Sequence, residues 1–162
     1  MSASQFPAGH ENAGDTADRE IIITRLIAAP RELVFAAFTD PKHVDNWWGP
    51  TGFRNETTSM DVRAGGDWIY MMRGGSQGDF DNKVHYLEVK SPERLVYLHG
   101  DWKDQGVFHV TLTFEAVHGK TWLTMKSLFS SAEQRAMVVE KYHAIEGGNQ
   151  TIDRLEAYLP TM

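Results

Sequence analysis

Hydrophobic and polar residues alternate along most of the chain between residues 20 and 129, a pattern typical of β-strands with one buried face. The clearest example is the segment 108–114, where Phe108, Val110, Leu112 and Phe114 would share one face of a strand. The same alternation predicts seven strands, over residues 21–27, 54–62, 66–73, 80–90, 94–100, 106–117 and 120–129.

Turn-forming residues separate these predicted strands. Glycine, proline and polar residues cluster at 74–79, 91–93 and 118–120. Connections this short join antiparallel neighbours, whereas parallel strands need a longer crossover. We therefore expect a meander of antiparallel hairpins with no crossover helix between them.

Two short helices are predicted between the first and second strands. Pro30 suits the first turn of a helix, because its missing N–H has no intrahelical partner there, and this helix would end near Thr39. Asp40 can cap a second helix that begins with Pro41 and ends at the Gly49-Pro50 step.

The hydrophobic period changes after Phe129, where Ser130 and Glu133 form a capping-box pattern at the start of a long helix. One apolar stripe of that helix would contain Met137, Ile145, Ile152, Leu155 and Leu159. The pair Gly147-Gly148 interrupts the helix, at a cost of about 1 kcal/mol for each glycine relative to alanine. We expect close packing or a kink at this pair.

Composition limits the domain organisation. The chain has 162 residues, 41% of them hydrophobic, which is enough for one sizeable core and leaves no room for a second domain. Residues 1–19 are mostly small and polar, with Phe6 as their only bulky apolar side chain. We expect a flexible tail over 1–19 and a single domain over 20–162.

Charge and cysteine content exclude several classes of function. The chain has 22 acidic and 16 basic side chains, a net charge of −6, and no run of Lys or Arg, so we expect neither nucleic acid nor a membrane surface as a partner. It has no cysteine, which excludes disulfides and thiolate chemistry. Without an apolar segment of ~20 residues or a secretory signal pattern, a cytoplasmic location is the default expectation.

Several ordered motifs carry a resemblance to a known family. They are Thr24-Arg25, Ala29-Pro30, Phe38-Thr39-Asp40-Pro41, Trp47-Trp48-Gly49-Pro50, residues 61–66, Glu88-Val89, residues 92–95 and Ile152-Asp153-Arg154-Leu155. Over roughly residues 20–159 the chain resembles the activator of heat-shock-protein-90 ATPase homologue-like family, in the START-like, birch-pollen-allergen-like superfamily.

This resemblance implies an α+β helix-grip fold, in which a curved antiparallel seven-stranded sheet wraps around one long C-terminal helix and encloses a cavity. The two short helices would lie between the first and second strands. The chain departs from its relatives at Gly147-Gly148, where they usually carry a Gly-Trp pair. The missing tryptophan would enlarge or open the cavity.

Aromatic and other apolar side chains on the elements that enclose the family's cavity are the candidate ligand-binding residues. They are Phe35, Phe38, Trp47, Trp48, Trp68, Tyr70, Met72, Tyr86, Phe108, Phe114, Tyr142 and Ile145. Any one of them is more often a core residue, because aromatic side chains are common core fillers. As a set they favour a pocket for a small hydrophobic or aromatic molecule.

Candidates for acid–base chemistry or metal binding are few. Glu88 is the best candidate for a catalytic carboxyl group, if the strand register turns it inward with Tyr86. His85, His99 and His109 lie on neighbouring predicted strands; we expect His85 and His99 to face each other and His109 to lie in solvent. Zinc needs three or four placed ligands, so the sequence favours neither a metal site nor another cofactor.

The sequence therefore favours the binding of a small hydrophobic or aromatic ligand, without a defined catalytic constellation. One alternative is an enzyme of the cyclase or dehydratase kind found among START-like relatives, in which pocket groups such as Glu88, Tyr86 or His85 move protons. Another is regulation of a chaperone ATPase, which the family name alone suggests. An exposed strand edge or the tryptophan pair is also compatible with a homodimer.

Overall fold

A computed structural model describes residues 16–162 of the chain. Most of the predicted N-terminal tail, residues 1–15, lies outside the described residues. The described part begins with buried Thr16 and a short 3-10 turn, η2 (Ala17–Arg19). No helix in residues 16–162 is long and apolar enough to cross a membrane.

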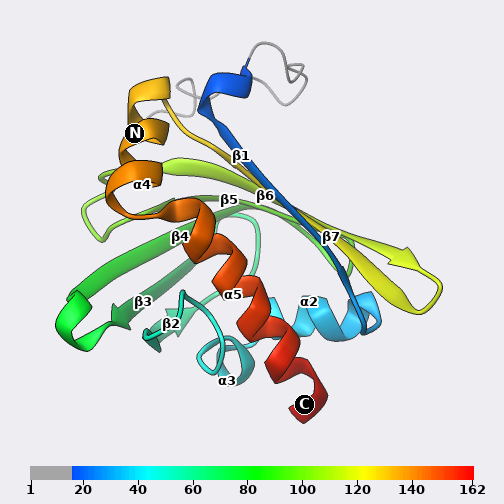
Figure 1. The fold of residues 1–162 in the computed structure, drawn as a ribbon. Coiled ribbons are helices and arrows are strands. Elements are labelled where there is room, and N and C mark those ends of the chain that lie inside the picture. The colour runs from blue at the N-terminus through cyan, green and yellow to red at the C-terminus, as the bar shows by residue number, and fades with distance from the viewer. Residues whose placement is uncertain (1–15) are drawn as a thin grey trace.

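The seven antiparallel strands that the sequence predicts form one curved sheet, in the order β1-β7-β6-β5-β4-β3-β2 (Figure 1). The strands are β1 (Glu20–Ile27), β2 (Arg54–Met60), β3 (Asp67–Arg73), β4 (Asp79–Lys90), β5 (Arg94–Gly100), β6 (Phe108–Val117) and β7 (Lys120–Leu128). Strands β2 to β7 are joined by hairpins, one of which contains the 3-10 turn η3 (Gly75–Gln77). The first strand returns to pair with the last, which leaves β1 and β2 as the two edges.

Two helices connect β1 to β2 and begin where the sequence predicts, but the second ends at Val44, before the predicted end at Gly49-Pro50. Helix α2 (Arg31–Thr39) starts directly after Pro30. Helix α3 (Pro41–Val44) is capped by Asp40, whose carboxylate accepts a hydrogen bond from the backbone N–H of Lys42. Both helices lie near the C-terminal end of the long helix α5 in Figure 1.

The C-terminal region consists of two helices, not the single one that the sequence predicts. These are α4 (Ala132–Lys141) and α5 (Ala144–Tyr158), followed by the 3-10 turn η4 (Leu159–Thr161). The break occurs at His143, which adopts a left-handed conformation with φ of 53°. A left-handed residue just beyond a helix C-cap reverses the chain direction, and α4 ends in this way.

The predicted capping box is displaced by one residue, and of the two alternatives at Gly147-Gly148 the structure shows close packing. Ser131, not Ser130, caps α4, and its hydroxyl accepts a hydrogen bond from the N–H of Gln134 at 3.0 Å. The glycine pair lies inside α5, where it allows close packing. A Cβ atom at Gly148 would lie 2.5 Å from Cδ1 of Ile23 on β1, so this side of α5 approaches the sheet closely.

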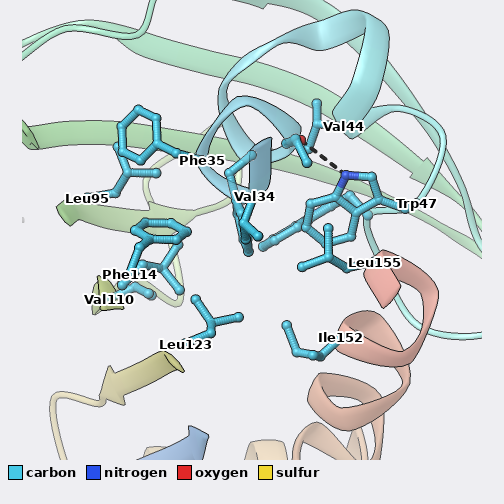
Figure 2. Close-up of a cluster of buried hydrophobic side chains, with 14 of the residues drawn as sticks. Val34, Phe35, Val44, Trp47, Leu95, Val110, Phe114, Leu123, Ile152 and Leu155 are labelled. Atoms are coloured by element: carbon cyan, nitrogen blue, oxygen red, sulfur yellow. Dashed lines mark hydrogen bonds between the residues drawn. The ribbon is translucent and has the colours of Figure 1, made fainter. Parts of the chain in front are cut away.

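The packed core lies between α2, the C-terminal half of α5 and one half of the concave face of the sheet (Figure 2). Phe35 from α2 contacts Phe114 from β6 edge to face, with ring centroids 5.3 Å apart. Trp47 is fully buried and donates a hydrogen bond from Nε1 to the carbonyl of Ala37, drawn as the dashed line in Figure 2. Leu155 of α5 is fully buried in the same cluster.

Candidate functional site

A cavity of about 850 Å³ lies between the concave face of the sheet and the α4–α5 segment. Met72, Asn82, His99 and Phe108 border it from four adjacent strands, β3 to β6. Val138 of α4 is among the residues that border it from the helical side. Further walls come from the loops 50–53 and 100–106.

The cavity occupies one end of the sheet because of how inward-facing residues are distributed along the strands. The four strand residues that border it lie at the C-terminal ends of β3 and β5 and the N-terminal ends of β4 and β6. In an antiparallel meander these ends coincide in space. Inward residues at the opposite ends, such as Trp68, Leu95 and Phe114, belong to the packed core.

Three of the predicted ligand-binding residues border this cavity: Met72, Phe108 and Tyr142. The other nine do not border it. They are Phe35, Phe38, Trp47, Trp48, Trp68, Tyr70, Tyr86, Phe114 and Ile145. These nine belong to the hydrophobic core or pack against it, at the end of the sheet that α2, α3 and α5 cover.

Several residues that border the cavity were missed in the sequence. Phe80 and Met137 are large apolar side chains that are 39% and 45% exposed, and both lie at the cavity. The signal for Phe80 was available in the alternation of β4. Phe80 and Asn82 continue the inward series of Val84 towards the open end of the sheet.

Polar contacts run through the wall of the cavity. The indole Nε1 of Trp48 donates a hydrogen bond to the hydroxyl of Tyr70 at 2.9 Å. That hydroxyl lies 3.0 Å from Nε2 of His99, and the same Nε2 lies 2.9 Å from Oδ1 of Asn82. The amide nitrogen of Asn82 donates to the carbonyl of Phe80, which fixes the orientation of the amide. These four side chains thus form one connected polar cluster, of which His99 and Asn82 border the cavity.

This polar cluster is uncharged at neutral pH. Burial lowers the pKa of His99 to about 4, because the charged imidazolium would lose its hydration. Burial also raises the pKa of Tyr70 well above its ordinary value of 10.0. Histidine and tyrosine in this wall therefore act as neutral hydrogen-bonding groups.

The charged residues that border the cavity are mostly acidic. Asp81, Asp101 and Glu146 carry carboxylates, and Lys141 carries the one ammonium group among the described cavity residues. Two of the carboxylates also accept backbone hydrogen bonds: Asp81 from Trp102 at 3.1 Å, and Asp101 from two N–H groups of its own loop. The surroundings of the cavity therefore carry a net negative charge.

Glu88, the candidate catalytic carboxyl group, points away from the cavity, so the inward register on which its candidacy depends does not occur. Tyr86 pairs with Tyr97, but Glu88 pairs with Val96, so Leu87 is an extra residue in a β-bulge. The bulge turns Glu88 outward, where its Oε2 lies 2.6 Å from Nε of Arg94. Tyr86 itself is buried in the core, which raises its pKa, and it does not border the cavity.

The three strand histidines do not converge, and the predicted pairing of His85 with His99 is wrong. His85 pairs with Leu98, and His99 pairs with Val84, which places the two rings on opposite faces of the sheet. His85 lies on the outer face, where its Nδ1 is 2.7 Å from Oδ1 of Asp67. His109 lies on the outer face too but is partly buried there, not in solvent, and this burial lowers its pKa.

Gly147 borders the cavity, but Gly148, the position of the expected missing tryptophan, does not. Gly148 faces Ile23 of β1 instead. The glycine at 148 therefore shortens the distance between helix and sheet, and no enlargement of the cavity follows from it.

This geometry defines the class of protein as a helix-grip fold with a cavity beside its long helix. The chain belongs to the family described as Activator of Hsp90 ATPase homolog 1-like protein, whose profile matches residues 28–160. A search of curated protein sequences finds no significant match.

Solved structures from several bacteria share the fold. Protein Ms6760 from Mycobacterium smegmatis is 26% identical, with a TM-score of 0.81 over 91% of this chain and 94% of that one. A Staphylococcus epidermidis protein is 28% identical, with a TM-score of 0.76 over 88% of this chain and 90% of that one. The AHSA1-like protein from Aeromonas hydrophila, 20% identical with a TM-score of 0.67 over 88% and 92% of the two chains, shows likeness of fold alone.

Proposed function

We propose that this protein binds a small, largely apolar molecule in the cavity between the α4–α5 segment and the concave face of the sheet. The observation that carries the proposal is the cavity itself, about 850 Å³ in volume. Binding sites for small molecules typically enclose about 300–1,000 Å³. The walls include the rings of Phe53, Phe80, Phe108 and Phe129.

Exposed apolar surface at the cavity supports the same proposal. Phe80, Met137 and Tyr142 keep between 39% and 52% of their surface accessible. Covering apolar surface gains about 25 cal/mol for each Å² removed from water, so a ligand in the cavity would be stabilised by these side chains. Helix α4, which carries Met137 and Val138, has no buried residue and forms the outer wall.

The test is a fluorescence titration with N-phenyl-1-naphthylamine, a neutral apolar probe. A Val138→Trp substitution would fill part of the cavity and is expected to weaken binding at least tenfold. Ala136→Trp is the matched control, because Ala136 is exposed on the same helix and does not border the cavity. Absence of saturable binding by the unmodified protein, or equal affinity of the two variants, would contradict the proposal.

A further inference from the structure

We infer that the cavity selects an uncharged aromatic molecule with a hydroxyl group, and that this hydroxyl donates a hydrogen bond to Nδ1 of His99. The inference rests on the proposed function and adds the class of ligand. It follows from four observations, on the tautomer of His99, on the accessibility of its second nitrogen, on the aromatic rings beside it, and on the charge around the cavity.

The tautomer of His99 is set by Asn82. The amide nitrogen of Asn82 donates to the carbonyl of Phe80 at 3.0 Å, so Oδ1 is the atom that faces His99. An amide oxygen only accepts hydrogen bonds, so the imidazole atom opposite it, Nε2, carries the proton. In a neutral imidazole the other nitrogen, Nδ1, is then an acceptor with a free lone pair.

The acceptor Nδ1 of His99 is available to a ligand. Both polar contacts of this ring use Nε2, and Nδ1 has no hydrogen-bond partner within residues 16–162. Over the same residues, Oδ1 of Asn55 is the one buried side-chain polar atom that lacks a partner. Nδ1 of His99 is therefore accessible, and His99 borders the cavity. A donor group on the ligand would satisfy this acceptor.

The immediate neighbours of His99 are suited to an aromatic ring. Phe108 lies beside the imidazole, with ring centroids 5.1 Å apart, and Phe129 lies 5.0 Å beyond Phe108. Both phenylalanines border the cavity. Aromatic rings prefer offset or edge-to-face contacts at 4.5–7 Å, so a flat ligand placed against these rings would bring its hydroxyl near His99.

Charge around the cavity disfavours an anion such as a carboxylate. Asp81, Asp101 and Glu146 outnumber Lys141, and burial keeps His99 neutral by lowering its pKa to about 4. A carboxylate placed against His99 would lose its hydration without a positive partner there. A hydroxyl group needs no counter-charge and can donate its proton to the imidazole.

The experiment compares three probes on one ring system: 2-naphthol, 2-methoxynaphthalene and 2-naphthoate, titrated against the full-length protein at pH 7. Only the first donates a hydrogen bond while remaining uncharged. We expect 2-naphthol to bind about tenfold more tightly than the methyl ether, the worth of one additional buried hydrogen bond, and 2-naphthoate to bind most weakly.

The His99→Gln variant isolates the acceptor. A glutamine amide can still donate to Asn82 but has no acceptor at the position of Nδ1, so the preference for 2-naphthol over its ether should fall to less than twofold.

Nitrogen-15 NMR of the unmodified protein gives an independent readout. On addition of 2-naphthol, the Nδ1 resonance of His99 should shift while Nε2 stays protonated.

The outcomes separate this inference from the proposed function. Equal affinity for 2-naphthol and its ether, an unshifted Nδ1 resonance or an unchanged preference in the His99→Gln variant would overturn the inference and leave the binding proposal standing. Failure of all three naphthalenes and of N-phenyl-1-naphthylamine to bind would overturn both.

Discussion

Trp48 and Tyr70 are joined by a hydrogen bond of 2.9 Å from the indole Nε1 to the phenol oxygen, in a place where both side chains are almost completely buried. Trp48 lies after α3 and Tyr70 in the middle of β3, so this bond attaches the connection between β1 and β2 to the sheet behind the cavity. Trp68 stacks on Tyr70 with ring centroids 4.0 Å apart. The polar wall of the cavity is thus supported by packed aromatic rings.

Removal of the Tyr70 hydroxyl should destabilise the protein. In the Tyr70→Phe variant the buried N–H of Trp48 has no acceptor, and an unsatisfied buried donor costs about 1–3 kcal/mol. Urea unfolding at neutral pH measures this change. Tyr142→Phe is the control, since Tyr142 is 52% exposed, and its free energy of unfolding should change by less than about 0.5 kcal/mol. Equal effects of the two substitutions would contradict the account of this wall.

The stability of the protein should depend on pH through His99. Its pKa falls from an ordinary 6.5 to about 4 in the folded protein, so between these values the unfolded chain binds the additional proton. Above pH 6.5 His99 is neutral in both states and does not lower the free energy of unfolding. As the pH falls from 6.5 towards about 4, His99 lowers the free energy of unfolding, and below pH 4 it causes no further change. At 1.36 kcal/mol for each pKa unit the loss is about 3 kcal/mol.

The rings that face His99 do not complicate this pH dependence. The ring centroids of Tyr70 and Tyr97 lie 6.0 and 6.3 Å from that of the imidazole, and burial raises the pKa of each tyrosine, so neither titrates between pH 4 and pH 7.5.

Unfolding free energies measured between pH 4 and pH 7.5 should show a smaller slope for His99→Gln than for the unmodified protein. Identical slopes would show that His99 is hydrated in the folded state.

Alanine should have different effects at the two glycines of α5. A Cβ at Gly147 would meet Pro50 at 3.6 Å, an ordinary contact, so Gly147→Ala should stabilise the protein by about 0.5–1 kcal/mol through helix propensity. A Cβ at Gly148 would lie 2.5 Å from Ile23, which must then move. Gly148→Ala should therefore be the less stable of the two in thermal unfolding. The opposite order would mean that α5 does not approach β1 as closely as described.

Arg154 should be important for stability, because within residues 16–162 its hydrogen bonds go to backbone carbonyls and not to a carboxylate. Its Nη1 donates to three consecutive carbonyls, those of Trp48, Gly49 and Pro50, at 3.2, 2.7 and 3.0 Å. Arg154→Met removes these charged hydrogen bonds, and we expect a loss of about 2 kcal/mol in urea unfolding.

Arg54→Met provides the comparison for Arg154. The side chain of Arg54 is 70% exposed and forms a surface ion pair with Glu56, so its replacement should cost about 0.5 kcal/mol or less. Similar losses in the two variants would indicate that the bonds of Arg154 to the loop after α3 are not formed in solution.

Most of the fold could be predicted from the sequence because its signals are local. Alternation of apolar residues gave the strands to within a few residues, and Pro30 and Asp40 placed both short helices. The break before α5 could not be predicted. It depends on a left-handed His143, a conformation for which glycine or asparagine is the usual signal.

The candidate site was only partly predictable for a different reason. Family resemblance identifies the elements around a helix-grip cavity, but not which end of the sheet is filled by core. Trp68 and Met72 lie on the same face of β3, yet Trp68 is packed in the core and Met72 borders the cavity. The orientation of Glu88 depends on a one-residue bulge at Leu87, which has no distinct pattern in the sequence.

Methionine methyl NMR tests the central claim, that a ligand occupies the cavity below α4, most directly. Met72 and Met137 border the cavity, whereas Met60 and Met125 pack against the core elsewhere. With carbon-13 in the methionine methyl groups, addition of N-phenyl-1-naphthylamine should shift the resonances of Met72 and Met137 and leave those of Met60 and Met125 in place. Shifts confined to Met60 and Met125, or no shift at any of the four, would contradict the claim.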